Sequence, residues 1–165
     1  MKKILLSLAM GMTAIGASAQ NSYNVRVGGA SLGDYAAFTA MAQANISIDH
    51  YGAWTFSPAG QFAMNDIDMA GMLHANMGYR TRIGNCCFFA PKVGVAGGYF
   101  QSVDYGNAWL VGPSIDLTFE FKHFVIGLTG FYSFNTIDYI YNGYAFYEDG
   151  AVNMHLLSLT LGYTF

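Results

Sequence analysis

A serine, a histidine and an acid held close together would make a nucleophilic active site, and the chain offers one local candidate for the first two. His155 and Ser158 lie near the C-terminus, three residues apart. If this segment is a strand, residues at that spacing point to opposite faces and the two side chains cannot meet. The other histidines, His50, His74 and His123, are scattered without the spacing of metal ligands. The sequence therefore predicts no catalytic residue, no metal site and no cofactor.

Two further groups have side chains that could do chemistry, a pair of adjacent cysteines and a short acidic segment. Cys86 and Cys87 are the only cysteines. Because adjacent side chains diverge along an extended chain, two buried or interfacial thiols are favoured over a strained vicinal disulfide or a bridge between molecules in an oxidising compartment. Residues 65–68 read Asn-Asp-Ile-Asp and offer oxygen ligands for a divalent cation. Two loop carboxylates are usually solvated, so this segment is a poor indication of a cation site.

The elements that would position these residues are strands with one apolar face. Residues 157–165 alternate with the period of two that is typical of a β-strand. The apolar face consists of Leu157, Leu159, Leu161, Tyr163 and Phe165. The other face carries Ser158, Thr160, Gly162 and Thr164. Similar alternation predicts further strands at residues 23–30, 40–48, 51–62, 73–83, 89–100, 109–121 and 124–135.

All three prolines fall inside these predicted strands. Proline has no N–H to donate to a strand ladder. Pro58 is therefore expected to end its strand early. Pro91 and Pro113 are expected to require local bulges.

The strand that ends on Phe165 resembles the last strand of small bacterial outer-membrane β-barrels, which typically ends in phenylalanine. In that family the final strand is the signal read by the barrel assembly machinery, so the resemblance implies this role for Tyr163 and Phe165. It also implies a barrel of the OmpA/OmpX type over the whole mature chain, with no periplasmic domain after it.

The N-terminus has the pattern of a secretory signal peptide. Lys2 and Lys3 precede an apolar run that starts at Ile4, and Ala17-Ser18-Ala19 supplies small residues for cleavage. Residues 1–19 are predicted to be removed, which leaves residues 20–165 as one barrel domain. Both ends of that domain would lie in the periplasm, so the number of strands should be even, and eight is the simplest count.

Composition fits this architecture and disfavours others. The chain is 53% hydrophobic and 10% charged, with 20 Gly, 12 Tyr and 13 Phe, which suits a barrel with small inward residues and aromatic girdles. After the signal peptide no run approaches the roughly 20 apolar residues of a membrane-spanning helix. A soluble β-sandwich would need polar outward faces. The net charge of −3 offers no basic patch, so nucleic acid is not an expected partner.

Six charged residues share one property, since each lies on the face of its strand opposite the apolar one: Arg26, Arg80, Arg82, Lys92, Asp116 and Glu120. An Arg or Lys that faced lipid at the midplane would cost about 2–4 kcal/mol. These residues are therefore predicted to form a network of opposite charges in a polar lumen filled by side chains, as befits an eight-stranded barrel. The alternative is that they line a narrow path for ions or protons.

The longest predicted extracellular loop, residues 138–151, is rich in aromatic residues: Tyr139, Tyr141, Tyr144, Phe146 and Tyr147. An aromatic belt at the lipid interface explains much of this content. Aromatic side chains beyond that belt would instead contact lipopolysaccharide, another protein or a host surface. The loop is thus the candidate for a surface interaction, with a partner that the sequence does not identify.

Taken together, the sequence predicts an all-β protein, a closed antiparallel up-and-down transmembrane β-barrel of eight strands in the bacterial outer membrane. It would be non-enzymatic, contact outer-membrane lipid and lipopolysaccharide, and act in envelope structure or in surface interaction such as adhesion. A narrow channel for ions or small solutes is the first alternative. A lipid A-modifying enzyme is the second, because some barrels that this chain resembles are lipid A hydrolases or acyltransferases.

Overall fold

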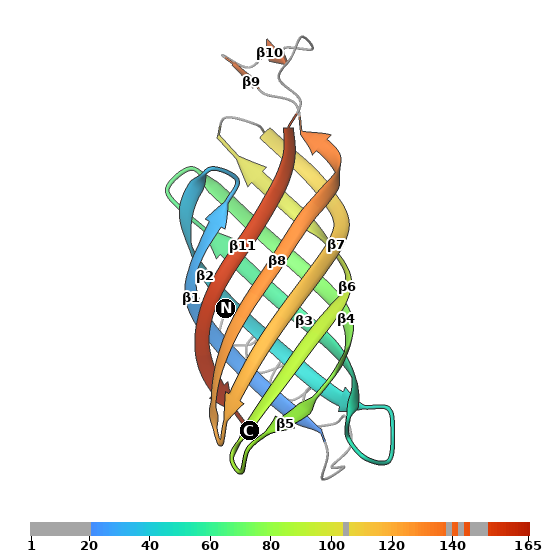
Figure 1. The fold of residues 1–165 in the computed structure, drawn as a ribbon. Helices are drawn as coiled ribbons and strands as arrows, with labels where there is room; N and C mark the ends of the chain where they lie inside the picture. The colour runs from blue at the N-terminus through green and yellow to red at the C-terminus, as the bar shows by residue number, and fades with distance from the viewer. Residues whose placement is uncertain (1–20, 104–105, 138–139, 142–143, 146–151) are drawn as a thin grey trace, which may run out of the picture.

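The structure, a computed structural model, describes residues 21–103, 106–137, 140–141, 144–145 and 152–165. The predicted signal peptide lies outside these ranges and stays a prediction. Figure 1 shows long, tilted strands wrapped around one axis, and eight of them form the barrel. They are β1 (Ser22–Leu32), β2 (Tyr35–Ser47), β3 (Trp54–Met64), β4 (Asp68–Tyr79), β6 (Cys87–Ser102), β7 (Gly106–Phe121), β8 (Phe124–Ile137) and β11 (Val152–Thr164). Among the described residues, no helix is long and apolar enough to cross a membrane.

Every long strand pairs antiparallel with the strand before it and the strand after it. The ring closes where β1 pairs with β11, from Asn24 opposite Thr164 to Leu32 opposite Leu156. Three short strands lie outside the ring of eight: β5 (Thr81–Ile83), which pairs with β6, and β9 (Ile140–Tyr141) and β10 (Tyr144–Ala145), which pair with each other. The predicted closed, eight-stranded, up-and-down barrel is confirmed.

The N-terminal strands differ most from their predicted boundaries. β2 begins at Tyr35 and β4 at Asp68, both five residues earlier than expected, and β3 spans Trp54–Met64. Alanine, glycine and methionine dominate these strand ends, so their apolar periodicity is weak. Backbone pairing with neighbouring strands, rather than local pattern, sets where they begin.

Pro58 and Pro91 are accommodated without the expected changes in their strands. The β2–β3 ladder omits the pairs next to Pro58 and resumes in the same register, so β3 does not end early. The β4–β6 ladder stops before Pro91, and β5 resumes it in the same register. The β7–β8 ladder begins at Ser114, directly after Pro113. The prediction of a bulge at Pro91 is therefore wrong. The ladder has a gap at this position, so no hydrogen bond from the missing N–H is needed.

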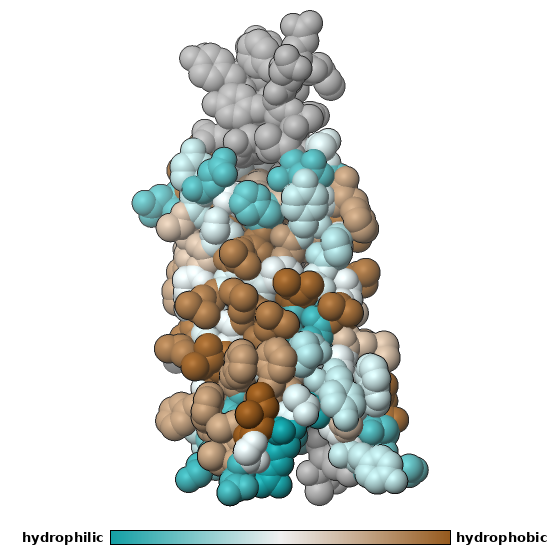
Figure 2. All heavy atoms as spheres, viewed as in Figure 1, coloured by the Kyte–Doolittle hydropathy of each residue, from teal (hydrophilic) through white to brown (hydrophobic). Residues whose placement is uncertain are grey.

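The outer surface of the barrel is apolar. Figure 2 shows a belt of hydrophobic side chains around the middle of the molecule, over β1, β11 and β8, with polar residues toward both ends. On β11 the predicted outward residues are exposed, whereas Ser158, Thr160 and Thr164 are buried. Aromatic pairs lie toward both ends of the belt: Trp54 with Tyr79 near the turn that follows β2, and Tyr99 with Trp109 near the loop between β6 and β7. This arrangement is the one that a lipid bilayer stabilises.

Candidate functional site in the barrel interior

The two ends of the barrel carry different segments of the chain. The C-terminal end carries Phe165 and the turn at Lys122–His123, and the loop end carries the turn at Gly33–Asp34 (Figure 1). The side chains that fill the interior differ between these ends. Polar residues fill the half toward the C-terminal end, and apolar residues fill the half toward the loop end.

The polar half is organised by the carboxylate of Asp116 on β7, which is fully buried. Its Oδ1 lies 3.0 Å from Nη1 of Arg26 and accepts a hydrogen bond of 2.8 Å from Oγ1 of Thr129. Its Oδ2 lies 3.2 Å from Nζ of Lys92 and accepts a hydrogen bond of 2.8 Å from Nε2 of Gln43. We call these five residues the Asp116 cluster. One carboxylate therefore links β7 to four other strands, β1, β2, β6 and β8.

The cations of the Asp116 cluster have further partners. Nζ of Lys92 also donates to Oε1 of Gln43 and Oγ1 of Thr118, each at 3.2 Å. Nη2 of Arg26 lies 2.8 Å from Sδ of Met41. The guanidinium fits because Gly127 opposite has no side chain; a Cβ there would collide with it. The donors of Lys92 are thus fully used, as a buried ammonium group requires.

A second ion pair closes the polar half at the C-terminal end. The guanidinium of Arg80 donates to Oε2 of Glu120 through Nη2 at 2.6 Å and Nε at 3.1 Å. Glu120 is buried, whereas the side chain of Arg80 is 24% exposed and packs on the ring of Phe88. This pair therefore lies at the boundary between the interior and solvent.

Neutral polar side chains fill the space between the Asp116 cluster and the apolar half. Nε2 of Gln61 donates to Oγ1 of Thr39 at 3.1 Å and to Oγ of Ser158 at 3.0 Å. Oγ of Ser114 donates to Oδ1 of Asn76 at 2.5 Å. The ring of His74 is buried here, and neither of its nitrogens has a hydrogen-bond partner among the described residues.

The other half of the interior is closed by an apolar plug, which we define as the cluster Leu32, Ala63, Ala70, Met72, Ala96, Phe100, Leu110, Phe131, Met154 and Leu156. Seven of the eight long strands contribute to it, and Ala37 of the eighth packs against it. The largest of these side chains, Phe100, has 0% of its surface exposed. The prediction of a polar lumen is therefore wrong for this half of the barrel.

Four of the six charged residues predicted to lie inside do so: Arg26, Lys92, Asp116 and Glu120. Arg80 reaches in from the C-terminal end. The placement predicted for Arg82 is wrong, because its side chain is exposed and donates to the carbonyl oxygens of Gly84 and Asn85. The strand breaks at Arg80, and β5 beyond it extends a hairpin outside the ring, so the alternation of faces no longer points into a lumen.

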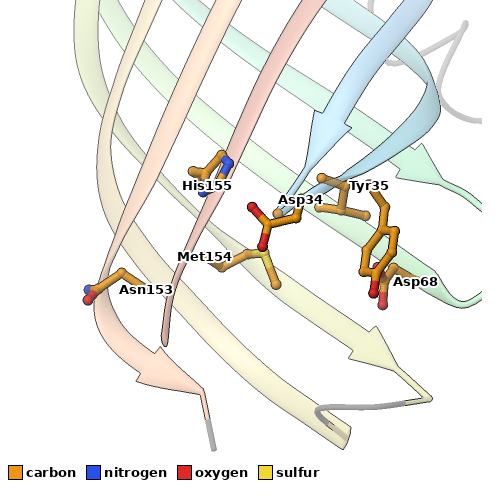
Figure 3. A pocket seen from close by; sticks show the side chains of 8 residues that line it. Asp34, Tyr35, Asp68, Asn153, Met154 and His155 are labelled. Atoms are coloured by element: carbon orange, nitrogen blue, oxygen red, sulfur yellow. The ribbon is translucent and has the colours of Figure 1, made fainter. Parts of the chain in front are cut away.

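A small pocket lies at the loop end, directly over the apolar plug (Figure 3). Leu32 and Met154 belong to both. The other lining residues are Gly33, Asp34, Tyr35, Asp68, Asn153 and His155. Asn65, which the sequence suggested as a cation ligand, instead accepts hydrogen bonds from the backbone N–H groups of Ile67 and Asp68. No three His, Cys, Asp or Glu side chains of the described chain are grouped to hold a metal ion.

Neither Ser158 nor Ser133, the two inward-facing serines nearest His155 in the sequence, is hydrogen-bonded to a histidine. Ser158 is buried in the lumen and bonded to Gln61, while His155 is only partly buried at the loop end. Oγ of Ser133 donates to the carbonyl oxygen of Asn135 and accepts the N–H of Met154. The hydroxyl of Ser133 therefore stabilises the strand ends, and its hydrogen bonds are to backbone groups rather than to a histidine.

The aromatic residues proposed for a surface interaction lie mostly outside the described chain. Tyr139, Phe146 and Tyr147 are not described, and for Tyr141 and Tyr144 only the backbone is described, as part of β9 and β10. At the opposite end Tyr163 and Phe165 are exposed, and the backbone N–H of Phe165 donates to the carbonyl oxygen of Tyr23 at 2.8 Å.

Comparison with known proteins reveals likeness in fold alone. No protein-family model matches the chain, and no curated protein sequence is similar to it. Neisserial surface protein A (NspA) superposes with a TM-score of 0.58 at 11% identity, over 87% of this chain and 94% of that one. The N-terminal barrel domain of Pseudomonas aeruginosa OprF gives 0.54 at 9% identity, over 87% and 97%.

The outer-membrane enzyme PagL is also similar, with a TM-score of 0.51 at 11% identity, over 87% of this chain and 98% of that one. The chain therefore has the fold of small eight-stranded outer-membrane β-barrels, as its last strand suggested. Since this fold carries both enzymes and other proteins, function has to be argued from the interior and the surface.

Proposed function

We propose that the chain is an integral protein of the bacterial outer membrane, a sealed and non-enzymatic barrel that acts in envelope structure or surface interaction through its loop end. The apolar belt supports insertion into lipid, and the fold is the one that outer-membrane barrels use. The observation that carries the proposal is the apolar plug across the axis of the barrel.

The apolar plug supports a barrel that does not conduct. An ion that crossed it would leave water for a close-packed apolar region, at a cost of several kcal/mol or more. Phe100, Leu110 and Phe131 fill the axis with side chains that cannot replace the hydration shell of an ion. The Asp116 cluster and Glu120 lie on one side of this barrier and the buried carboxylate of Asp68 lies on the other, so the apolar plug interrupts any path between the buried charges.

The polar half supports a structural role for the buried charges. Each ion of the Asp116 cluster is neutralised or hydrogen-bonded by residues from other strands. Such fixed pairing favours a structural role in a filled lumen. In a proton relay, by contrast, a charged group must exchange partners.

No specific observation favours either alternative, a narrow channel or a lipid A-modifying enzyme. A channel would need polar groups through both halves. An enzyme that modifies lipid A would need an activated nucleophile, and Ser133 and Ser158 are bonded to groups that do not activate them. Likeness in fold to PagL does not supply those residues.

The partners follow from the surface. Lipid and lipopolysaccharide would contact the apolar belt, and the barrel assembly machinery would bind the last strand through Tyr163 and Phe165. The aromatic segment at residues 138–151 is the proposed contact for a surface partner. These roles rest on the sequence and on the exposure of the C-terminal strand.

Electrical recording tests the proposal. The purified barrel, refolded and inserted into planar lipid bilayers, should give no steady openings. A variant with Phe100→Ala, Leu110→Ala and Phe131→Ala removes the largest side chains around the axis and should conduct, whereas Phe100→Leu alone should stay silent. Steady openings of the unaltered barrel that change with Arg80→Gln or Glu120→Gln would overturn the proposal in favour of a channel.

A further inference from the structure

The two cysteines lie side by side at the C-terminal end of the barrel, far from the interior. Cys86 ends the turn between β5 and β6, and Cys87 is the first residue of β6. Cys86 is exposed, Cys87 is partly buried, and both are unbonded. Their Sγ atoms are 3.8 Å apart. The pair is therefore a solvent-accessible dithiol rather than two diverging thiols.

The turn explains why the sulfur atoms converge. Gly84 has a φ of 67°, a left-handed conformation that glycine adopts without strain. The guanidinium of Arg82 donates to the carbonyl oxygen of Gly84 at 3.1 Å and to that of Asn85 at 2.7 Å. These contacts hold the chain in a turn, so Cys86 does not follow the alternation of an extended strand.

Two cationic residues belong to the turns that adjoin the pair. Arg82 belongs to the same turn, and the N–H of Lys122 in the neighbouring turn lies 3.4 Å from the carbonyl oxygen of Cys86. Both cationic side chains are exposed, and neither turn contains an acidic residue. Cys86 is the more exposed of the two thiols, so an incoming disulfide would meet it first, and its attack proceeds through the thiolate.

We propose that Cys86 and Cys87 form a site for thiol–disulfide exchange, which accepts a disulfide substrate and closes to a vicinal disulfide. The thiolate of Cys86 attacks one sulfur of the substrate, forms a mixed disulfide and releases the first substrate thiolate. The thiolate of Cys87 then attacks Sγ of Cys86, forms the Cys86–Cys87 bond and releases the second. The protein loses two electrons and two protons, and the substrate disulfide is reduced to two thiols.

The Cys86–Cys87 disulfide formed in this reaction should be easily reduced again. Consecutive Cα atoms are about 3.8 Å apart, below the usual range of about 4.4–6.8 Å for disulfides, so the closed form is strained and readily reduced. The substrate class is a small-molecule or protein disulfide. Its supply in the cell rests on the proposed function, which places this turn in the oxidising periplasm.

The test uses the full barrel refolded in detergent, so its outcome does not depend on where the protein resides. The barrel is incubated with glutathione disulfide, quenched with acid and analysed by intact-mass spectrometry, with the variants Cys87→Ser and Cys86→Ser in parallel. The main product of the unaltered barrel should have lost the mass of two hydrogens, and only a minor fraction should retain glutathione. Cys87→Ser should retain one glutathione on Cys86, at least about tenfold more than the unaltered barrel. Circular dichroism checks that each variant is folded.

Three results would overturn the proposal. The first is that the unaltered barrel retains as much glutathione as Cys87→Ser. The second is that its main product is a disulfide-linked dimer. The third is that both thiols remain free under conditions in which glutathione disulfide oxidises a reference dithiol. Each of these would leave the proposed function of the barrel intact, because that function is tested by conductance.

Discussion

The two halves of the barrel interior are built on the same strands and filled in opposite ways. In the polar half, one carboxylate, that of Asp116, takes partners from four other strands. In the apolar half, ten side chains pack together without a single hydrogen bond between them. The polar half depends on the direction of its hydrogen bonds and ion pairs, whereas the apolar half depends on how completely its side chains fill the space.

This difference separates two tasks of a small barrel. Hydrogen bonds and ion pairs are directional, so the Asp116 cluster favours one register: a shift of β7 by one residue would turn Asp116 toward lipid and away from its partners. Apolar packing is less sensitive to direction, but it excludes water and ions. The polar half thus specifies the arrangement of the strands, and the apolar plug seals it.

The largest effect should come from breaking the centre of the polar half. Asp116→Ala leaves Arg26 and Lys92 buried without a counter-charge, and it should lower the free energy of unfolding by about 3–5 kcal/mol. Urea titration of the refolded barrel in lipid vesicles measures this. A loss below about 1 kcal/mol would mean that the charges are solvated rather than buried.

A smaller loss is expected in the apolar half. Leu110→Ala leaves a cavity in the apolar plug and should cost about 2–3 kcal/mol, toward the lower end of the range for buried leucine because the pocket at the loop end lies nearby. The same urea titration applies. Valine at the exposed position Val111 provides the matched control, since Val111→Ala should change the stability much less. Equal losses at the two positions would contradict the packing described for Leu110.

The ion pair at the boundary should contribute less again. Arg80→Gln removes the partner of Glu120, but the position is partly solvated, so the expected loss is about 1 kcal/mol. The loss should diminish as salt is added, because the Arg80 side of the pair is partly open to solvent and is therefore partly screened. An effect as large as that of Asp116→Ala, unchanged by salt, would place this pair in the interior proper.

The smallest effect is expected at Arg82, whose side chain lies outside the ring. Arg82→Gln should leave the unfolding transition unchanged within the error of the urea titration, because exposed substitutions rarely alter stability. A marked loss would show that Arg82 belongs to the network after all. The same variant should slow closure of the Cys86–Cys87 dithiol, which a glutathione disulfide time course detects.

Much of the barrel could be predicted from the sequence because the residues that face lipid are apolar and recur at every second position. The alternation in β7, β8 and β11 gave the correct faces, and Arg26, Lys92, Asp116 and Glu120 followed as inward residues. The apolar plug was missed because Phe100, Leu110 and Phe131 sit between residues that are themselves outward and mostly apolar. Their positions in the alternation place them on the inward face, but an apolar residue on that face is not distinguished by its type from the outward apolar residues beside it.

Other features could not be predicted from local pattern. The exposed position of Arg82 depends on the break in the strand at Arg80, and the gap at Pro91 depends on which neighbour its missing donor would face. Both are properties of the pairing between strands. The convergence of Cys86 and Cys87 likewise depends on a turn held by Arg82, which the spacing of the residues does not reveal.

Access of water to the apolar plug tests the central claim most directly. A cysteine placed at Ala96, in a barrel that also carries Cys86→Ser and Cys87→Ser, reports whether a small charged thiol reagent reaches the apolar half. Asn85→Cys in the same background is the exposed control and should react at once. A sealed barrel predicts that the cysteine at position 96 reacts only after the protein is unfolded. Labelling of the folded barrel at a rate close to that of the Asn85→Cys control would contradict it.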